Sequence, residues 1–305
     1  MPHVVQLRLS PYGYTPTEFV CIIYVVLFSI STLLHFGQAA YYRLWWLLPT
    51  ACLAGLLEIL GWSARLWSAI MPHLFKSYEI QIVCTIMGPT PLAAANFIIL
   101  GHVITRLGPA YSRLSPNHYT ILFLCCDIVS LVVQGVGGGI AAIAVNMRRN
   151  PARGGHIMLG GIVFQMVTIL AYAVCAGEFL LRFSQDRPAR QLLGPGAPPS
   201  QPRGVLTPKM RLLLGALVFN TTCLFIRAVY RVIELSDGWT GRIIQTQVYF
   251  NVLDGAMITL AILTLNVAHP GALLGLRRAP QKTVMEKDAD GSEEVLETEK
   301  ALARG

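Results

Sequence analysis

Long apolar stretches separated by short polar loops dominate the first 268 residues of this chain. A membrane-spanning helix needs about 20 predominantly apolar residues, and seven stretches are that long. We expect the spans at residues 18–40, 46–68, 80–105, 119–145, 156–181, 209–234 and 247–268. The pattern therefore predicts an all-α fold, an integral membrane bundle of seven transmembrane helices.

Composition supports this class. The 305 residues are 54% hydrophobic and 13% charged, with a mean hydropathy of +0.54, whereas soluble domains carry about 25% charged residues. Disordered proteins, coiled coils and ordinary soluble enzymes are excluded. The net charge of +8 could suit nucleic acid or an anionic membrane surface, and the position of the charges favours the membrane, with no nucleic-acid partner.

The distribution of Lys and Arg predicts the orientation, because basic residues gather in cytoplasmic loops. With the N-terminus outside, 15 basic residues lie in inner segments and 6 in outer segments. The outer loop with Arg148, Arg149 and Arg153 goes against this trend. We expect the N-terminus outside and the C-terminus in the cytosol.

Three segments outside the spans complete the organisation. Residues 1–17 form an extracellular N-terminal segment, and residues 18–268 form the transmembrane domain. A long cytosolic loop, 182–211, contains a Pro/Gly-rich stretch at 194–202 that is typical of a flexible linker. Residues 269–305 make a cytosolic tail whose composition is typical of disorder.

Ionisable residues inside the spans are the first candidates for function. A charge in the membrane interior costs several kcal/mol or more on most scales, so such residues usually face the bundle interior and find partners. The spans hold five acids and three arginines: Glu58, Asp127, Glu178, Glu234, Asp254, Arg65, Arg227 and Arg231. The three arginines cannot neutralise every acid, so some acids must be solvated, neutral or directed at a ligand.

Helical spacing places several of these charges together. Arg227, Arg231 and Glu234 are four and three residues apart and share one helix face. We expect a polar substrate cavity that opens toward the outside and is lined by Glu58, Arg65, Asp127, Gln134, Arg227, Arg231, Glu234 and Asp254. The alternative is a set of buried ion pairs that only fixes helix packing.

Two spans contain weak helix formers. Pro89 and Pro91 remove two backbone donors near the middle of the third span, which predicts a kink or a break. Gly137, Gly138 and Gly139 in the fourth span predict a hinge or a close helix contact, and a contact is the commoner role.

Several chemical signatures are absent from the sequence. It contains no P-loop pattern, no His-Glu-x-x-His and no Gly-x-Ser-x-Gly. The seven histidines are scattered, and all seven cysteines fall inside spans. We therefore expect no catalytic residues, no metal, no cofactor and no enzyme activity.

A series of local patterns along residues 12–271 resembles a fungal family, the lipid-translocating exporters, which includes sphingoid long-chain-base exporter-like proteins. The patterns are Tyr12-Gly13-Tyr14-Thr15-Pro16, Glu58-x-x-Gly61-x-x-x-Arg65, Phe123-x-x-Cys126-Asp127-x-x-Ser130-x-x-x-Gln134, Gly160-Gly161-x-x-x-Gln165, Arg227-x-x-Tyr230-Arg231-x-x-Glu234, Asp254 and Asn266-x-x-His269-Pro270-Gly271. Each alone is weak, but their order and positions make the joint match specific. The chain departs from the family at Gln247, where many members have a glutamate.

The resemblance implies a seven-helix bundle with its N-terminus outside, located in the plasma membrane. It also implies export or outward translocation of amphipathic lipids or toxic lipophilic compounds, often linked to drug resistance. The partners would be membrane lipid and a small amphipathic substrate. A seven-helix receptor or sensor for a lipid or drug is the alternative, and an intramembrane lipid enzyme is the least favoured.

Overall fold

The computed structural model describes residues 12–147, 149–189, 204–238 and 241–275. Seven helical spans in these residues are long and apolar enough to cross a membrane: Glu18–Tyr42, Trp45–Ile70, Phe75–Leu107, Pro116–Val145, Ala152–Ser184, Pro208–Ser236 and Gln247–Leu273. The predicted seven-helix architecture is therefore confirmed. The third span begins at Phe75 rather than at residue 80.

All regular secondary structure in the described residues is helical. The main helices are α2 (Glu18–Tyr42), α3 (Leu53–Ile70), α4 (Phe75–Met87), α5 (Pro89–Leu107), α6 (Pro116–Asn146), α7 (Ala152–Ser184), α8 (Pro208–Ser236) and α10 (Met257–Val267). Shorter pieces are the 3-10 helices η1 (Trp45–Leu47) and η3 (Pro109–Tyr111), the π-helices η2 (Leu48–Cys52) and η4 (Phe250–Ala256), α9 (Gln247–Tyr249) and α11 (Pro270–Leu273).

Two of the long helices start in the same way. The Ser115 and Thr207 side chains each accept from the backbone N–H of the third residue of the helix that follows, and each is followed by a proline. Proline suits the first helical position because its missing N–H would have no partner there. These signals fix the starts of α6 and α8.

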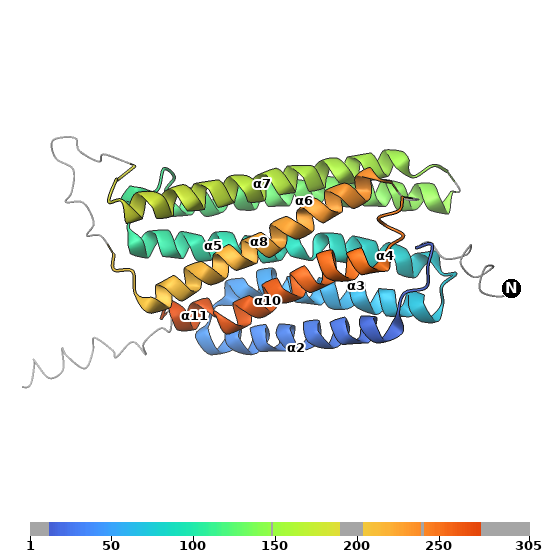
Figure 1. The fold of residues 1–305 in the computed structure, drawn as a ribbon, viewed down its shortest axis with the longest axis horizontal. Helices are drawn as coiled ribbons and strands as arrows, with labels where there is room; N and C mark the ends of the chain where they lie inside the picture. The colour runs from blue at the N-terminus through green and yellow to red at the C-terminus, as the bar shows by residue number, and fades with distance from the viewer. Residues whose placement is uncertain (1–11, 148, 190–203, 239–240, 276–305) are drawn as a thin grey trace, which may run out of the picture.

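The spans lie side by side with their axes roughly aligned (Figure 1). Helix α3 contacts α2 and α4, α7 contacts α6 and α8, and α10 contacts α8 and α2, while α5 contacts α6, α8 and the π-helix η2. In the third span 72% of the most apolar stretch is buried, against 28% in the first and fourth spans. Exposed side chains on the outer faces are apolar, such as Leu33 and Val174, as a bilayer requires.

The two ends of the described bundle lie far apart. α2 begins at one end of the bundle, and α11 lies at the opposite end (Figure 1). Which end faces the cytosol stays a prediction. Within the expected tail, 269–305, the helix α11 (Pro270–Leu273) packs against α2 and α8. Residues 1–11, the linker at 194–202 and residues 276–305 lie outside the described residues.

Candidate functional site

α8 carries the polar face predicted from its spacing. Arg227, Arg231 and Glu234 are each at most 3% exposed. Arg231 Nη1 donates to Glu234 Oε2 at 2.8 Å, and the Tyr230 hydroxyl donates to Glu234 Oε1 at 2.8 Å. Glu234 is thereby fixed by its own helix.

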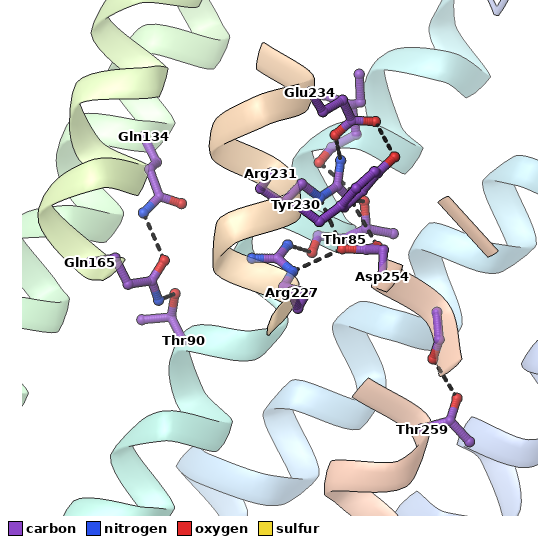
Figure 2. A network of polar contacts seen from close by, with 12 residues as sticks. Thr85, Thr90, Gln134, Gln165, Arg227, Tyr230, Arg231, Glu234, Asp254 and Thr259 are labelled. Carbon is purple, nitrogen blue, oxygen red and sulfur yellow. Dashed lines mark hydrogen bonds and ion pairs between the residues drawn. The ribbon is translucent and has the colours of Figure 1, made fainter. Parts of the chain in front are cut away.

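Asp254 supplies the facing carboxylate, from the last span. Its Oδ1 accepts from Arg227 Nε at 2.8 Å and from Arg231 Nε at 2.9 Å, and its Oδ2 accepts from Arg231 Nη2 at 2.8 Å (Figure 2). The contact with Arg231 is bidentate, the strongest geometry for an arginine and a carboxylate. Because two arginines four residues apart repel each other, one shared acid is what allows them to coexist in the interior.

Asp254 lies within the π-helix η4 rather than in a regular α-helix. A π-helix widens the turn and leaves backbone carbonyls without their usual donors, and it occurs often at functional sites. The Tyr24 hydroxyl donates to the Asn251 carbonyl at 2.7 Å, and the Thr259 hydroxyl donates to the Gly255 carbonyl at 2.8 Å. Side chains from α2 and α10 therefore stabilise the irregular turn.

Thr85 on α4 closes the network from a third direction. Its carbonyl accepts from Arg227 Nη2 at 2.6 Å, and its hydroxyl accepts from Arg231 Nη2 at 2.9 Å. Gly61 on α3 allows this approach, because an added Cβ would lie 2.6 Å from the Thr85 methyl group. We call Thr85, Arg227, Arg231, Glu234 and Asp254 the arginine network.

Glu58 lies beside the arginine network without joining its hydrogen bonds. It is 0% exposed, and neither of its oxygens accepts a hydrogen bond of normal geometry. The charges of Asp254, Arg227 and Arg231 are within electrostatic reach. Gly88 makes the room for it, since a Cβ there would lie 2.5 Å from Glu58 Oε1.

Arg65 is stabilised by aromatic rings instead of an acid. It is 1% exposed, and its Nη2 donates to the Tyr14 hydroxyl at 2.7 Å. Four rings lie within cation–π range of its guanidinium, those of Phe250, Tyr12, Tyr14 and Trp62, at 4.3–5.7 Å from the centroids. Burial raises the pKa of Tyr12 to about 12 and also raises the pKa of Tyr14, so both hydroxyls stay neutral beside the guanidinium.

Phe250 connects Arg65 to the arginine network. The guanidinium carbons of Arg65 and Arg231 lie 4.3 Å and 5.0 Å from the centre of its ring. The ring is 4% exposed and belongs to η4, the same π-helix that holds Asp254. One aromatic side chain therefore separates two buried cations that would otherwise repel each other.

The remaining predicted residues lie elsewhere in the bundle. Gln134 on α6 donates to Gln165 on α7 at 3.1 Å, and Gln165 donates to the Thr90 hydroxyl on α5 at 2.8 Å (Figure 2). Asp127, two turns earlier on α6, is 1% exposed, and neither oxygen has a hydrogen-bond partner in the described part of the chain. Asp127 is thus a lone buried carboxyl.

Glu178 is accounted for by other basic residues. Its Oε1 lies 2.7 Å from Arg113 Nε and 2.8 Å from Arg182 Nε, in a partly exposed position near the end of α7. Of the buried arginines, Arg227 and Arg231 pair with Asp254 and Glu234, whereas Arg65 has aromatic partners. Glu58 and Asp127 accept no hydrogen bond among the described residues. Across the residues that the structure describes, no three His, Cys, Asp or Glu side chains gather as a metal ion would require.

A family model described as RTA1 like protein matches residues 51–277. The chain belongs to the RTA1-like family. A relative from Saccharomyces cerevisiae (strain Lalvin EC1118 / Prise de mousse), named sphingoid long-chain base transporter RSB1, is 27% identical over 282 residues, 85% of this chain and 73% of the relative.

Two further relatives carry family names. Lipid-translocating exporter-like protein RTA1 from Leptosphaeria maculans is 25% identical and covers 93% of this chain and 56% of its own length. Protein RTA1 of Saccharomyces cerevisiae (strain ATCC 204508 / S288c) is 24% identical over 96% of both chains. No solved structure matches this RTA1-like protein.

The segment that the RTA1-like family model matches, residues 51–277, contains all eight residues predicted for the cavity. The structure brings six of them together around Phe250 and Thr85, namely Glu58, Arg65, Arg227, Arg231, Glu234 and Asp254, and leaves Asp127 and Gln134 on a separate helix pair. In this conformation the arginine network is closed to solvent. A substrate cavity at these residues stays a prediction.

Sequence reasoning missed Thr85, Phe250 and the donor role of Tyr230. Tyr230 could have been found from the sequence, because it precedes Glu234 by four residues and so lies on the same helix face. Thr85 and Phe250 are ordinary in sequence, and only their distance from the arginines in space identifies them.

Of the two predicted helix interruptions, the structure has one in the third span and none in the fourth. Helix α4 ends at Met87 and α5 begins at Pro89, with Gly88 between them. α6 runs without interruption through Gly137, Gly138 and Gly139, and Gly137 contacts the backbone of Met158 on α7. A hinge role for these residues stays a prediction.

Proposed function

We propose that this chain is a membrane transporter that exports amphipathic lipids, or moves them outward across the bilayer, with sphingoid bases as the cargo class. The relative named sphingoid long-chain base transporter supports this proposal, because the match covers 85% of this chain. We place the protein in the plasma membrane with its N-terminus outside and its C-terminus in the cytosol, as the basic loops favour.

The observation that carries the proposal is the lone carboxyl of Asp127, supported by that of Glu58. A buried carboxylate without a partner costs far more than a paired one, and unpaired ionisable groups in a membrane interior mark transport pathways or proton relays. A sphingoid base carries an ammonium group, which is the natural partner of a carboxylate. Asp127 and Glu58 therefore offer two positions that a cationic head or a proton can occupy in turn.

The arginine network has a second part in this proposal. Asp254 is shared by Arg227 and Arg231, so a cationic cargo near Asp254 would compete with both arginines for one carboxylate. The wide turn at η4 allows that segment to change register when the carboxylate changes partner. We assign the arginine network the role of a switch between closed and open forms.

The energy for export comes from an ion gradient or from the gradient of the lipid itself, since the sequence has no P-loop for ATP. No enzyme activity is part of this proposal.

Efflux of a labelled sphingoid base from cells tests this function. We would compare cells that carry the chain, an empty vector, the Asp254→Asn form, the Arg231→Ala form and a Glu18→Gln control. Glu18 is an exposed acid at the start of α2 and does not belong to the arginine network. We expect export by the chain and the control, and none by the other two forms at equal surface expression.

Equal efflux from every cell line, with the protein confirmed at the surface, would overturn the transport proposal. Saturable binding of the lipid without net efflux would favour the alternative, a seven-helix lipid or drug sensor. Normal export by both the Asp254→Asn and Arg231→Ala forms would remove the role that we give to the arginine network.

A further inference from the structure

A cleft lies between α4 and α6, and no residue of the arginine network lines it. It encloses about 190 Å³ and is lined by side chains of both helices and by the residue before α7: Phe75, Tyr78, Glu79, Ile82, Val83, Gly138, Ala141, Ala142, Val145 and Pro151. Phe75 and Val83 are 49% and 36% exposed, so the cleft opens to the outer face of the bundle. In a membrane that face contacts the acyl chains of lipids.

The single acid in this apolar cleft is Glu79. Its Oε1 is buried and accepts no hydrogen bond from any residue that the structure describes. An apolar wall with one unpaired carboxylate oxygen favours a cation attached to a hydrocarbon chain over a neutral lipid, because a charge-assisted hydrogen bond is the stronger one, and it disfavours an anionic lipid. The charge in the cleft therefore selects the kind of occupant.

Small residues on α6 create the space. Gly138, Ala141 and Ala142 face α4, and a Cβ added at Gly138 would meet only Val83 and the Met158 sulfur, at 3.9 and 3.7 Å. An alanine therefore fits at Gly138 with ordinary contacts, whereas a leucine must extend into the cleft. This gives the glycine-rich stretch of α6 a role besides the helix contact at Gly137.

The level of the carboxylate in the bilayer suits a lipid head group. Glu79 lies four residues after the first residue of α4, which is about 6 Å along the helix axis. From Phe75 to Val83 the wall extends about 12 Å toward the middle of the bundle. A head group at Glu79 would lie near the membrane surface, with its chain directed along Ile82 and Val83 toward the bilayer centre.

We propose that this cleft binds the ammonium head and the adjoining chain of a single-chain cationic amphiphile taken from the surrounding membrane leaflet. Glu79 holds the ammonium, and the α4 and α6 side chains cover the chain. The inference rests on the proposed function only where it makes this ligand the exported cargo, because binding itself is measured separately.

Photocrosslinking of the full-length protein in lipid nanodiscs tests the site. The probe is octadecylamine with a diazirine on its chain, competed with unlabelled octadecylamine or with octadecanol, its neutral analogue. We expect the label in peptides covering 75–83 or 138–145, displaced by the amine and not by the alcohol. Because a charge-assisted contact is lost, Glu79→Gln should weaken apparent affinity about tenfold.

Matched variants separate charge from shape. Gly138→Leu should abolish labelling by filling the cleft, Gly138→Ala should retain it, and Glu18→Gln should label like the unmodified chain. Thermal melting of each variant shows whether it is folded. If Gly138→Leu fails to fold, Ala142→Leu fills the same cleft from the next turn of α6.

Three results would overturn the inference. The first is labelling that maps outside both segments, and the second is equal competition by octadecanol. The third is an affinity that is unchanged both in Glu79→Gln and in the variant whose cleft is filled by leucine. Equal competition would instead indicate a neutral lipid as occupant. Efflux measured on the same variants separates the two proposals. Equal export by the unmodified chain and by Glu79→Gln would leave the transport function intact and contradict only the assignment of the cleft ligand as the exported cargo. Cleft labelling without any export would contradict only the transport function.

Discussion

Asp254 and Arg231 form a bidentate pair at the centre of the bundle, with Nε–Oδ1 at 2.9 Å and Nη2–Oδ2 at 2.8 Å. The same carboxylate also accepts from Arg227 at 2.8 Å. Both members of the pair are 1% exposed or less. The pair therefore joins α8 to the last span through a contact that is buried from solvent.

Asp254→Asn should destabilise the protein by about 3–5 kcal/mol, because removing one partner of a buried pair leaves an uncompensated charge. Thermal melting in detergent measures this loss, with Glu18→Gln as the control. Adding Arg231→Met to Asp254→Asn should cost less than the sum of the two single changes, because the double variant removes both charges. Additive costs would show that the two side chains do not interact.

The membrane spans and the face of α8 could be predicted from sequence for a simple physical reason. Apolar length determines where a helix can cross a bilayer, and spacing of three and four residues determines which side chains share a helix face. Arg227, Arg231 and Glu234 do lie on one buried face, as predicted. These are local properties of the chain.

The pairing of charges could not be predicted, because it depends on packing between distant spans. Arg65 lies on an acid-containing helix but is stabilised by aromatic rings, and Phe250 reaches it from the other end of the sequence. The apolar pattern places the start of the third span at residue 80, whereas α4 begins at Phe75, so that Glu79 lies within the helix. The π-helix at Asp254 has no signature in the sequence that we could identify.

Ionisation of Tyr12 should lower the stability of the folded protein at alkaline pH. Burial raises its pKa to about 12, from an ordinary value near 10. The neutral hydroxyl is favoured in the folded state, so its contribution to stability is complete below about pH 10 and disappears as the pH rises to about 12. This amounts to about 2–3 kcal/mol.

Tyr12→Phe should therefore change the pH profile of stability and not only its level. At about pH 8 the variant should be about 1 kcal/mol less stable, because the Tyr12 hydroxyl no longer donates to Ser68 at 3.2 Å. At about pH 12 that difference should vanish or reverse, because the variant has no phenol to ionise. Melting temperatures across this range measure it, with Tyr249→Phe at an exposed position as the control; parallel profiles for Tyr12→Phe and the unmodified protein would contradict it.

Gly137 and Gly139 provide a matched pair for the fourth span. A Cβ at Gly137 would overlap the backbone of Met158, whereas one at Gly139 would meet nothing within 4 Å. Gly137→Ala should cost about 1–3 kcal/mol through overpacking, and Gly139→Ala should leave the melting temperature unchanged or slightly raised. If the glycines instead form a hinge, Gly139→Ala would lower export without any change in stability.

Among the buried acids, Asp127 is the one whose substitution should affect transport strongly and stability least. Because its carboxyl has no hydrogen-bond partner among the described residues, Asp127→Asn removes no ion pair and should change the free energy of unfolding by less than about 1 kcal/mol. Export should nevertheless fall strongly, since an amide can neither bind an ammonium through charge nor carry a proton. Efflux and thermal melting measured on one preparation test both halves. Normal export by Asp127→Asn would move the cargo site to Glu58 or Glu79, and a large loss of stability would mean that the carboxyl has a structural partner in another conformation.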